Sequence, residues 1–260
     1  MDKVSKVVLS FDDGRRDNVT LIRDILVSNG LPVTLNLSTG YIDGTARKER
    51  YPGPNPAMTL EEAKELASLP GVEIAGHGWE HLNTLEDLKK VVDTLRSWFP
   101  NQEVCGIASP NSILHEDEIL AHQAEYEAMG IRYVRIGAGA TYSGARRVMG
   151  KLSRSIHNDW LFVTSNQGAV EHTFDRFVLT AVPVMRQQTK QQVEALVEYC
   201  WKNGKDLILM FHSVVHKKDP FHDDTWSWDY EDFVSLAYDL KELDKAGKIQ
   251  LTTTADAVAK

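Results

Sequence analysis

The chain has 260 residues, 42% of them hydrophobic and 25% charged, so it can bury a large core as one domain spanning 1–260. Its net charge of −8 disfavours binding to nucleic acid or to an anionic membrane, because both need a basic face. Cys105 and Cys200 form no CxxC pair, so neither a thiolate metal site nor a disulfide is expected. With no signal peptide and no apolar run of about 20 residues, we expect no membrane span and a cytoplasmic protein, or an extracytoplasmic one whose leader has been removed.

Short apolar runs alternate with amphipathic stretches along the chain. The predicted elements, in order, are strand 7–11, helix 18–28, strand 33–37, helix 59–68, strand 72–75, helix 84–98, strand 104–108, helix 116–129, strands 133–136 and 177–180, helix 189–203, strand 206–211, helix 230–246 and strand 249–252. The segment 137–167 has a weak pattern and is predicted to be irregular. This alternation predicts a parallel sheet covered by helices, as a closed or nearly closed α/β barrel. An open doubly wound sheet is the alternative.

Polar residues recur at the carboxyl ends of the predicted strands. Asp12 and Asp13 follow the first strand, His77 the third, Asn111 the fourth and His212 the strand 206–211. In a barrel these ends meet on one face, which is where such folds keep their active sites. We therefore expect these residues to be neighbours.

Two histidines four residues apart, His77 and His81, suggest a metal site. On one face of a helical turn both imidazoles reach the same ion. A carboxylate from the pair Asp12–Asp13 would complete three protein ligands and leave positions open, as in catalytic zinc sites. The second carboxylate would then be free to accept a proton, although a surface turn also accounts for the pair. His212 is either a core residue or a general acid.

Four stretches in this order resemble the polysaccharide deacetylases, carbohydrate esterase family 4. They are Ser10–Gly14 (SFDDG), His77–His81 (HGWEH), Ile107–Pro110 (IASP) and Leu209–His212 (LMFH), and 251–256 resembles the family's last strand and helix. The resemblance spans nearly the whole chain. It implies a distorted (β/α) barrel with seven parallel strands and a metal-dependent deacetylase.

The resemblance also assigns roles to residues. It implies that Asp12 is the catalytic base and that His212 protonates the leaving group. The oxyanion would lie against the metal and the backbone N–H of Asn111. The metal would be one divalent ion, zinc or otherwise cobalt, nickel, manganese or iron, held by Asp13, His77 and His81.

The chain departs from the family pattern at several positions. The arginine that usually pairs with the base is replaced by Ala108, and Arg135 on the next strand is the expected substitute, with Arg15 or Arg16 as alternatives. Gly78 stands where the family often has Ser or Thr. Asp159–Trp160 resembles the Asp-Trp motif that supports the catalytic histidine.

The expected reaction is removal of an acetyl group, in particular an N-acetyl group, from a sugar or polysaccharide. Tyr51, Trp226 and Trp228 are expected to line the sugar site, because aromatic faces pack on pyranose rings. Two alternatives stay open: a non-catalytic carbohydrate-binding protein, and an amidohydrolase acting on a non-sugar C–N bond. Oligomeric state is not predicted.

Overall fold

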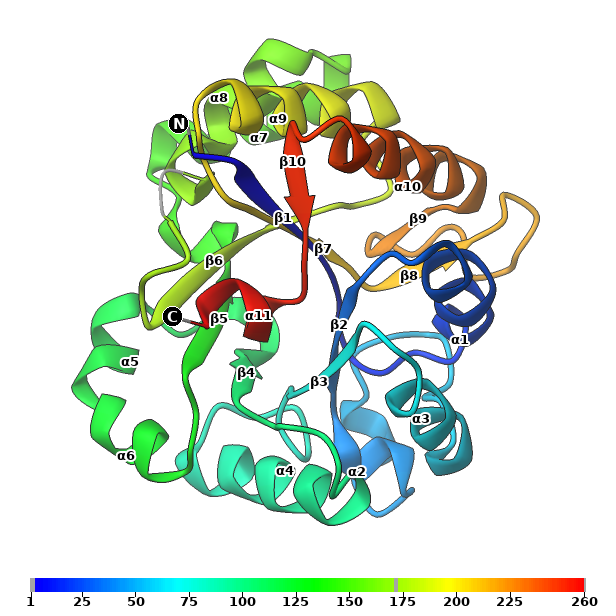
Figure 1. Cartoon of the computed structure of the whole chain (residues 1–260), viewed down its shortest axis with the longest axis vertical. Coiled ribbons are helices and arrows are strands. Elements are labelled where there is room, and N and C mark those ends of the chain that lie inside the picture. The colour runs from blue at the N-terminus through cyan, green and yellow to red at the C-terminus, as the bar shows by residue number, and fades with distance from the viewer. Residues whose placement is uncertain (1–2, 171–172, 260) are drawn as a thin grey trace.

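The computed structural model describes residues 3–170 and 173–259, and its centre is a closed barrel of parallel strands (Figure 1). The barrel strands are β1 (Ser5–Phe11), β2 (Val33–Leu37), β3 (Val72–Gly76), β4 (Gly106–Ala108), β5 (Tyr133–Gly137), β6 (Val178–Pro183) and β7 (Leu207–Phe211). Each pairs in parallel with the next, and β1 also pairs with β7 over five residues, which closes the ring. The predicted barrel of seven parallel strands is confirmed, and the open sheet is wrong.

A further strand, β10 (Ile249–Leu251), distorts the barrel. It pairs with the start of β1, at Ser5–Val7, while β2 pairs with β1 only at Ser10 and Phe11. β10 therefore occupies the place where β1 and β2 diverge. The short helix α11 (Thr254–Val258) follows and covers the amino-terminal end of the barrel. There the Glu73 carboxylate accepts hydrogen bonds from the Ala255 backbone N–H and from Tyr133 Oη.

Helices surround the strands on the outside (Figure 1). Within the described residues they are α1 (Asn18–Leu21), α2 (Thr39–Ile42), α3 (Leu60–Ala67), α4 (Leu85–Trp98), α5 (Glu116–Ala121), α6 (Gln123–Ala128), α7 (Gly144–Ile156), α8 (Asp159–Val170), α9 (Lys190–Lys202) and α10 (Tyr230–Lys245). A small parallel pair, β8 (Ser213–Val215) with β9 (Ser227–Asp229), lies beyond β7. None of the described helices is both long and apolar enough to cross a membrane.

Three helix predictions needed correction. The helix expected at 18–28 continues past α1 as a π turn and a 3₁₀ turn, and the one expected at 116–129 breaks at His122. The segment expected to be irregular forms α7 and α8. Its pattern misled because α7 buries the small residues Gly150 and Ser153 and leaves Val148 and Leu152 exposed.

Side-chain alternation along the strands sets the interior of the barrel. Val7, Leu9 and Phe11 join the large core between strands and helices, whereas Val8 joins a smaller inner cluster with Tyr133. Because successive side chains of a strand point to opposite faces, Asp12 and Arg135 continue the inner rows of β1 and β5. The inner row of β7 contains Ile208 and Met210 and leads to His212.

Candidate metal centre and catalytic site

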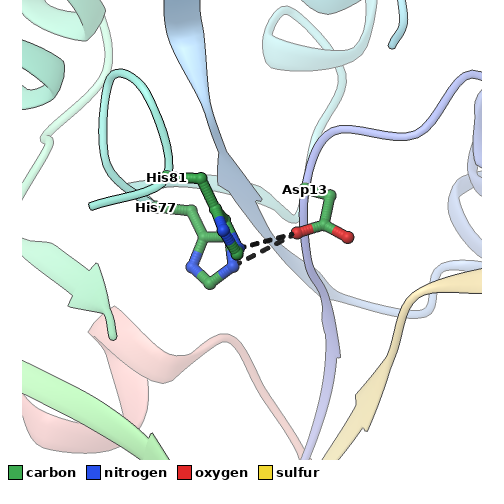
Figure 2. Close-up of side chains that lie close together, drawn as sticks. All are labelled: Asp13, His77 and His81. Carbon is green, nitrogen blue, oxygen red and sulfur yellow. Dashed lines mark ion pairs between the residues drawn. The ribbon is translucent and has the colours of Figure 1, made fainter. Parts of the chain in front are cut away.

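Asp13, His77 and His81 come together at the carboxyl ends of β1 and β3. Figure 2 shows both imidazoles directed at the same carboxylate oxygen. Asp13 Oδ1 lies 3.3 Å from His77 Nε2 and 3.4 Å from His81 Nε2, and all three side chains are buried. Burial alone would raise the pKa of Asp13, but the adjacent imidazoles of His77 and His81 hold it well below its usual range.

The contacts behind these three residues fit a cation. His77 Nδ1 lies 2.9 Å from the Ala108 carbonyl oxygen, so a neutral ring donates there and presents its bare Nε2 lone pair to Asp13. Asp13 Oδ1 is buried and has no hydrogen-bond partner of good geometry among the described residues. A divalent cation between these atoms would take the place of the proton that they otherwise have to share. One carboxylate and two imidazoles are a donor set suited to zinc and other divalent transition metals.

Arg15 holds the second oxygen of Asp13. Its Nε donates to Asp13 Oδ2 at 3.0 Å, and its Nη1 reaches Ser213 Oγ at 2.8 Å and Asp224 Oδ2 at 3.1 Å. Arg15 is 1% exposed. The sequence had offered Arg15 or Arg16 as partners of Asp12, but Arg15 belongs to Asp13, and Arg16 pairs with Glu62 at the surface.

The segment that carries the two histidines is not helical, contrary to prediction. Residues 77–81 form a bend in which Gly78 has φ +75° and His81 has φ +58°. Asp87 at the start of α4 fixes this bend, because its carboxylate accepts the backbone N–H groups of Glu80 and Leu82 at 2.9 and 3.1 Å. A Cβ on Gly78 would lie 2.7 Å from Asp87 Oδ2. Asp87 therefore occupies the space that a serine or threonine at position 78 would need.

Asp12 is paired with Arg135 across the barrel interior. Arg135 Nη2 lies 2.5 Å from Asp12 Oδ1, and Asn36 Nδ2 donates to the same oxygen at 2.8 Å. Burial alone would raise the pKa of Asp12, but Arg135 and then His77 lower it below the usual value. Asp12 is thus held ionised, with its Oδ2 3.9 Å from His77 Nε2.

His212 lies beyond the end of β7, and its ring packs at a tilt of 44° against Trp226 with ring centroids 4.6 Å apart. Desolvation lowers the pKa of His212 to about 4. Its Nδ1 has no hydrogen-bond partner among the described residues. The structure does not bring Asp159–Trp160 to His212: both begin α8, and the Trp160 side chain is 69% exposed.

The remaining predicted residues divide between the cavity and the core. Asn111, with φ +54°, lines the cavity and places its Nδ2 3.4 Å from His81 Nδ1. Trp226 lines the cavity as well. Trp228 does not, because it is 1% exposed, packs on Phe211 and donates its indole N–H to the Gln188 carbonyl. Tyr51 packs on Tyr41 outside the lining, so the structure places neither Trp228 nor Tyr51 in the wall of this cavity.

A cavity of about 470 Å³ opens over these groups. Its floor contains Asp12, Asp13, His77, His81 and His212, and its walls include Tyr142, Met185 and Trp226. The wall formed by α7 adds Arg147, Lys151 and Arg154. The sequence reading missed this wall, since it took the segment as irregular. It also missed Asp87, because its position beside the bend at residues 77–81 follows only from the fold.

Comparison with known proteins agrees with this geometry. The family model for polysaccharide deacetylase matches residues 2–134, about half of the chain. The chain belongs to the polysaccharide deacetylase family. Curated proteins gave no match.

Among solved structures, a candidate polysaccharide deacetylase from Mycobacterium smegmatis has the same fold. It is 14% identical, with a TM-score of 0.57 over 99% of this chain and 90% of that one. The Streptococcus pyogenes deacetylase PplD, solved with acetate, is 22% identical, with a TM-score of 0.40 over 50% of this chain and 54% of that one. This chain thus spans about half the length of PplD. A de-N-acetylase from Aggregatibacter actinomycetemcomitans is 15% identical, with a TM-score of 0.41 over 50% of this chain and 62% of that one.

Proposed function

We propose that this family member is a metal-dependent hydrolase that removes acetyl groups, in particular N-acetyl groups, from a carbohydrate. The observation that carries the proposal is the buried convergence of Asp13, His77 and His81 beside an ionised Asp12. Zinc is the metal we expect there, with cobalt, nickel, manganese or iron as alternatives. A bound cation would polarise the acetyl carbonyl and lower the pKa of water in the cavity.

The chain's own residues supply the proton transfers. Asp12, kept ionised by Arg135, accepts the proton of the attacking water. The backbone N–H of Asn111 is the proposed donor to the oxyanion. The proton that Asp12 takes from water passes to the departing amine or hydroxyl through His212, which is neutral until it accepts that proton. Because burial lowers its pKa to about 4, the protonated ring is a stronger acid than free imidazole, and Asp13 and Asp12 favour that charged form.

The alternative of a degenerate, non-catalytic carbohydrate binder rested on the missing arginine at Ala108 and on Asn111 in place of the aromatic residue that commonly follows the motif's proline. Arg135 removes the first reason, because it pairs with Asp12 from the neighbouring strand. An amidohydrolase acting without metal is disfavoured by the complete three-ligand group of Asp13, His77 and His81.

The test measures acetate released from N-acetylated and O-acetylated oligosaccharides by the full chain, before and after chelation and after reloading with zinc. We expect activity to be lost with the metal and restored by it. His77→Ala should abolish metal binding and turnover together, while His122→Ala, a surface histidine paired with Glu125, should leave both intact. Full activity in His77→Ala would refute the mechanism. Turnover that survives complete chelation would favour the metal-free alternative.

A further inference from the structure

One wall of the catalytic cavity carries a row of positive charges. Arg147, Lys151 and Arg154 all come from α7, and all three line the cavity that contains the metal centre. Their spacing of four and then three residues places them on one face of the helix. At 1.5 Å per residue the row extends about 10 Å along the cavity wall.

These three cations are not neutralised by the protein. Within the described residues, none of the three side chains has an ion pair or a hydrogen bond, and the only acidic residues in the cavity lining are Asp12 and Asp13. Each of those carboxylates already has its own arginine, Arg135 and Arg15.

Two features set this row apart from an ordinary solvated helix face. The chain as a whole has a net charge of −8, so an unpaired cluster of positive charges at one concave site has the opposite sign to the net charge of the protein. The neighbouring Arg146 on the same helix is directed elsewhere, with its guanidinium against Gly168 of α8 and outside the cavity lining.

We propose that α7 recognises an anionic group, a carboxylate or a phosphate, on the acetylated saccharide. This inference rests on the proposed deacetylase function and adds the substrate's charge to it. Arginine presents a planar fork of donors that matches both anions, and lysine adds a mobile point charge. The cavity volume of about 470 Å³ lies in the range of small-ligand sites, with room for a sugar beside its charged group. Tyr142 and Trp226 in the same lining offer faces for pyranose rings.

The experiment compares the zinc-loaded wild type with the triple variant Arg147→Gln, Lys151→Gln, Arg154→Gln. Arg146→Gln is the matched control, since it removes a charge from the same helix outside the cavity. Two substrate pairs separate the sources of charge: a hyaluronan tetrasaccharide against tetra-N-acetylchitotetraose for carboxylate, and N-acetylglucosamine 1-phosphate against N-acetylglucosamine for phosphate. Circular dichroism checks that the variants are folded.

We expect the wild type to prefer the charged member of at least one pair. In the triple variant KM for that substrate should rise by about tenfold with kcat within about twofold. The three side chains contact the substrate's anion equally in the bound complex and in the transition state, so their loss weakens binding and leaves the chemical step unchanged. Neutral substrates and the Arg146→Gln variant should change little. Added salt should erase the wild-type preference. No preference in the wild type, or equal losses on charged and neutral substrates, would overturn the proposal.

A binding measurement separates this inference from the proposed function. Calorimetry follows the binding of the hyaluronan tetrasaccharide and of N-acetylglucosamine 1-phosphate to wild type, triple variant and control, without requiring turnover. If no acetate is released from any substrate but an anion binds the wild type and not the triple variant, the deacetylase proposal fails and the anion site stands. Equal binding to all three proteins, or no binding, overturns the anion site.

Discussion

Arg135 and Ala108 are direct register partners on adjacent parallel strands, β5 and β4. Neighbouring strands lie about 4.8 Å apart, and paired residues face the same side of the sheet. An arginine at position 135 therefore has its backbone one strand away from position 108, and its side chain still reaches Asp12 in the interior. This relationship explains how Asp12 keeps an arginine partner although the neighbouring strand carries Ala108 at the paired position.

Arg135→Ala should destabilise the protein by about 3–5 kcal/mol, because it leaves the buried Asp12 charge without its partner. Urea unfolding measures the loss. The double variant Ala108→Arg, Arg135→Ala returns the guanidinium to the neighbouring strand and should recover part of both stability and deacetylation. No recovery, with the fold intact, would show that the two positions are not equivalent.

Arg15→Gln should weaken metal binding by about 10- to 100-fold, because Arg15 orients the carboxylate of Asp13 from behind. Arg16→Gln changes the same charge at an exposed neighbour and should have no effect. Zinc titration against a competing chelator gives both affinities. Equal zinc affinities in the two variants would mean that Asp13 binds the metal without help from Arg15.

His212→Asn should lower kcat by about 10²- to 10⁴-fold, the range for loss of a general acid. Its metal affinity should stay at the wild-type value, since His212 is not one of the three grouped ligands. Substrates with better leaving groups should be affected less. A parallel fall in metal affinity would instead place His212 among the ligands.

Glu73→Gln should change how stability depends on pH. Burial raises the pKa of Glu73 in the folded protein, so its proton favours the folded state at low pH. That contribution is fully present below the unfolded value of about 4.3 and is lost as the pH rises through the folded pKa. The variant's stability relative to wild type should therefore be higher at pH 7 than at pH 4. The quantity to compare is the free energy of unfolding of Glu73→Gln minus that of wild type, which should be larger at pH 7. The exposed Glu61→Gln serves as control, and a pH-independent difference for Glu73→Gln would contradict the assignment.

The barrel could be predicted because its strands are short, mainly apolar runs, and several of them, among them β1, β3 and β7, are followed by polar residues. The grouping of Asp12, Asp13, His77 and His212 followed from that rule alone. The rest depended on contacts that no local pattern contains. Asp87 lies on α4, which follows the bend at residues 77–81. Its hydrogen bonds to that bend form only when the bend packs back onto the helix.

The α7 wall escaped prediction for a related reason. Its buried face consists of Gly150 and Ser153, so its hydrophobic periodicity points away from the protein instead of toward a core. Trp228 and Tyr51 lie outside the cavity lining for a different reason: an aromatic residue near a site can pack behind its lining instead of forming part of it.

The pairing of β1 with β7 and β10 gives the metal centre a particular place in the order of folding. The backbone N–H of Asp12 donates to the Phe211 carbonyl, so the first ligand-bearing strand is held by partners some 200 residues later in the chain. Contacts of such long sequence separation form slowly. During synthesis, the two histidines can emerge and fold against β2 long before Asp13 has a fixed position. Tight uptake of the proposed cation would therefore be a late event that follows closure of the ring of strands.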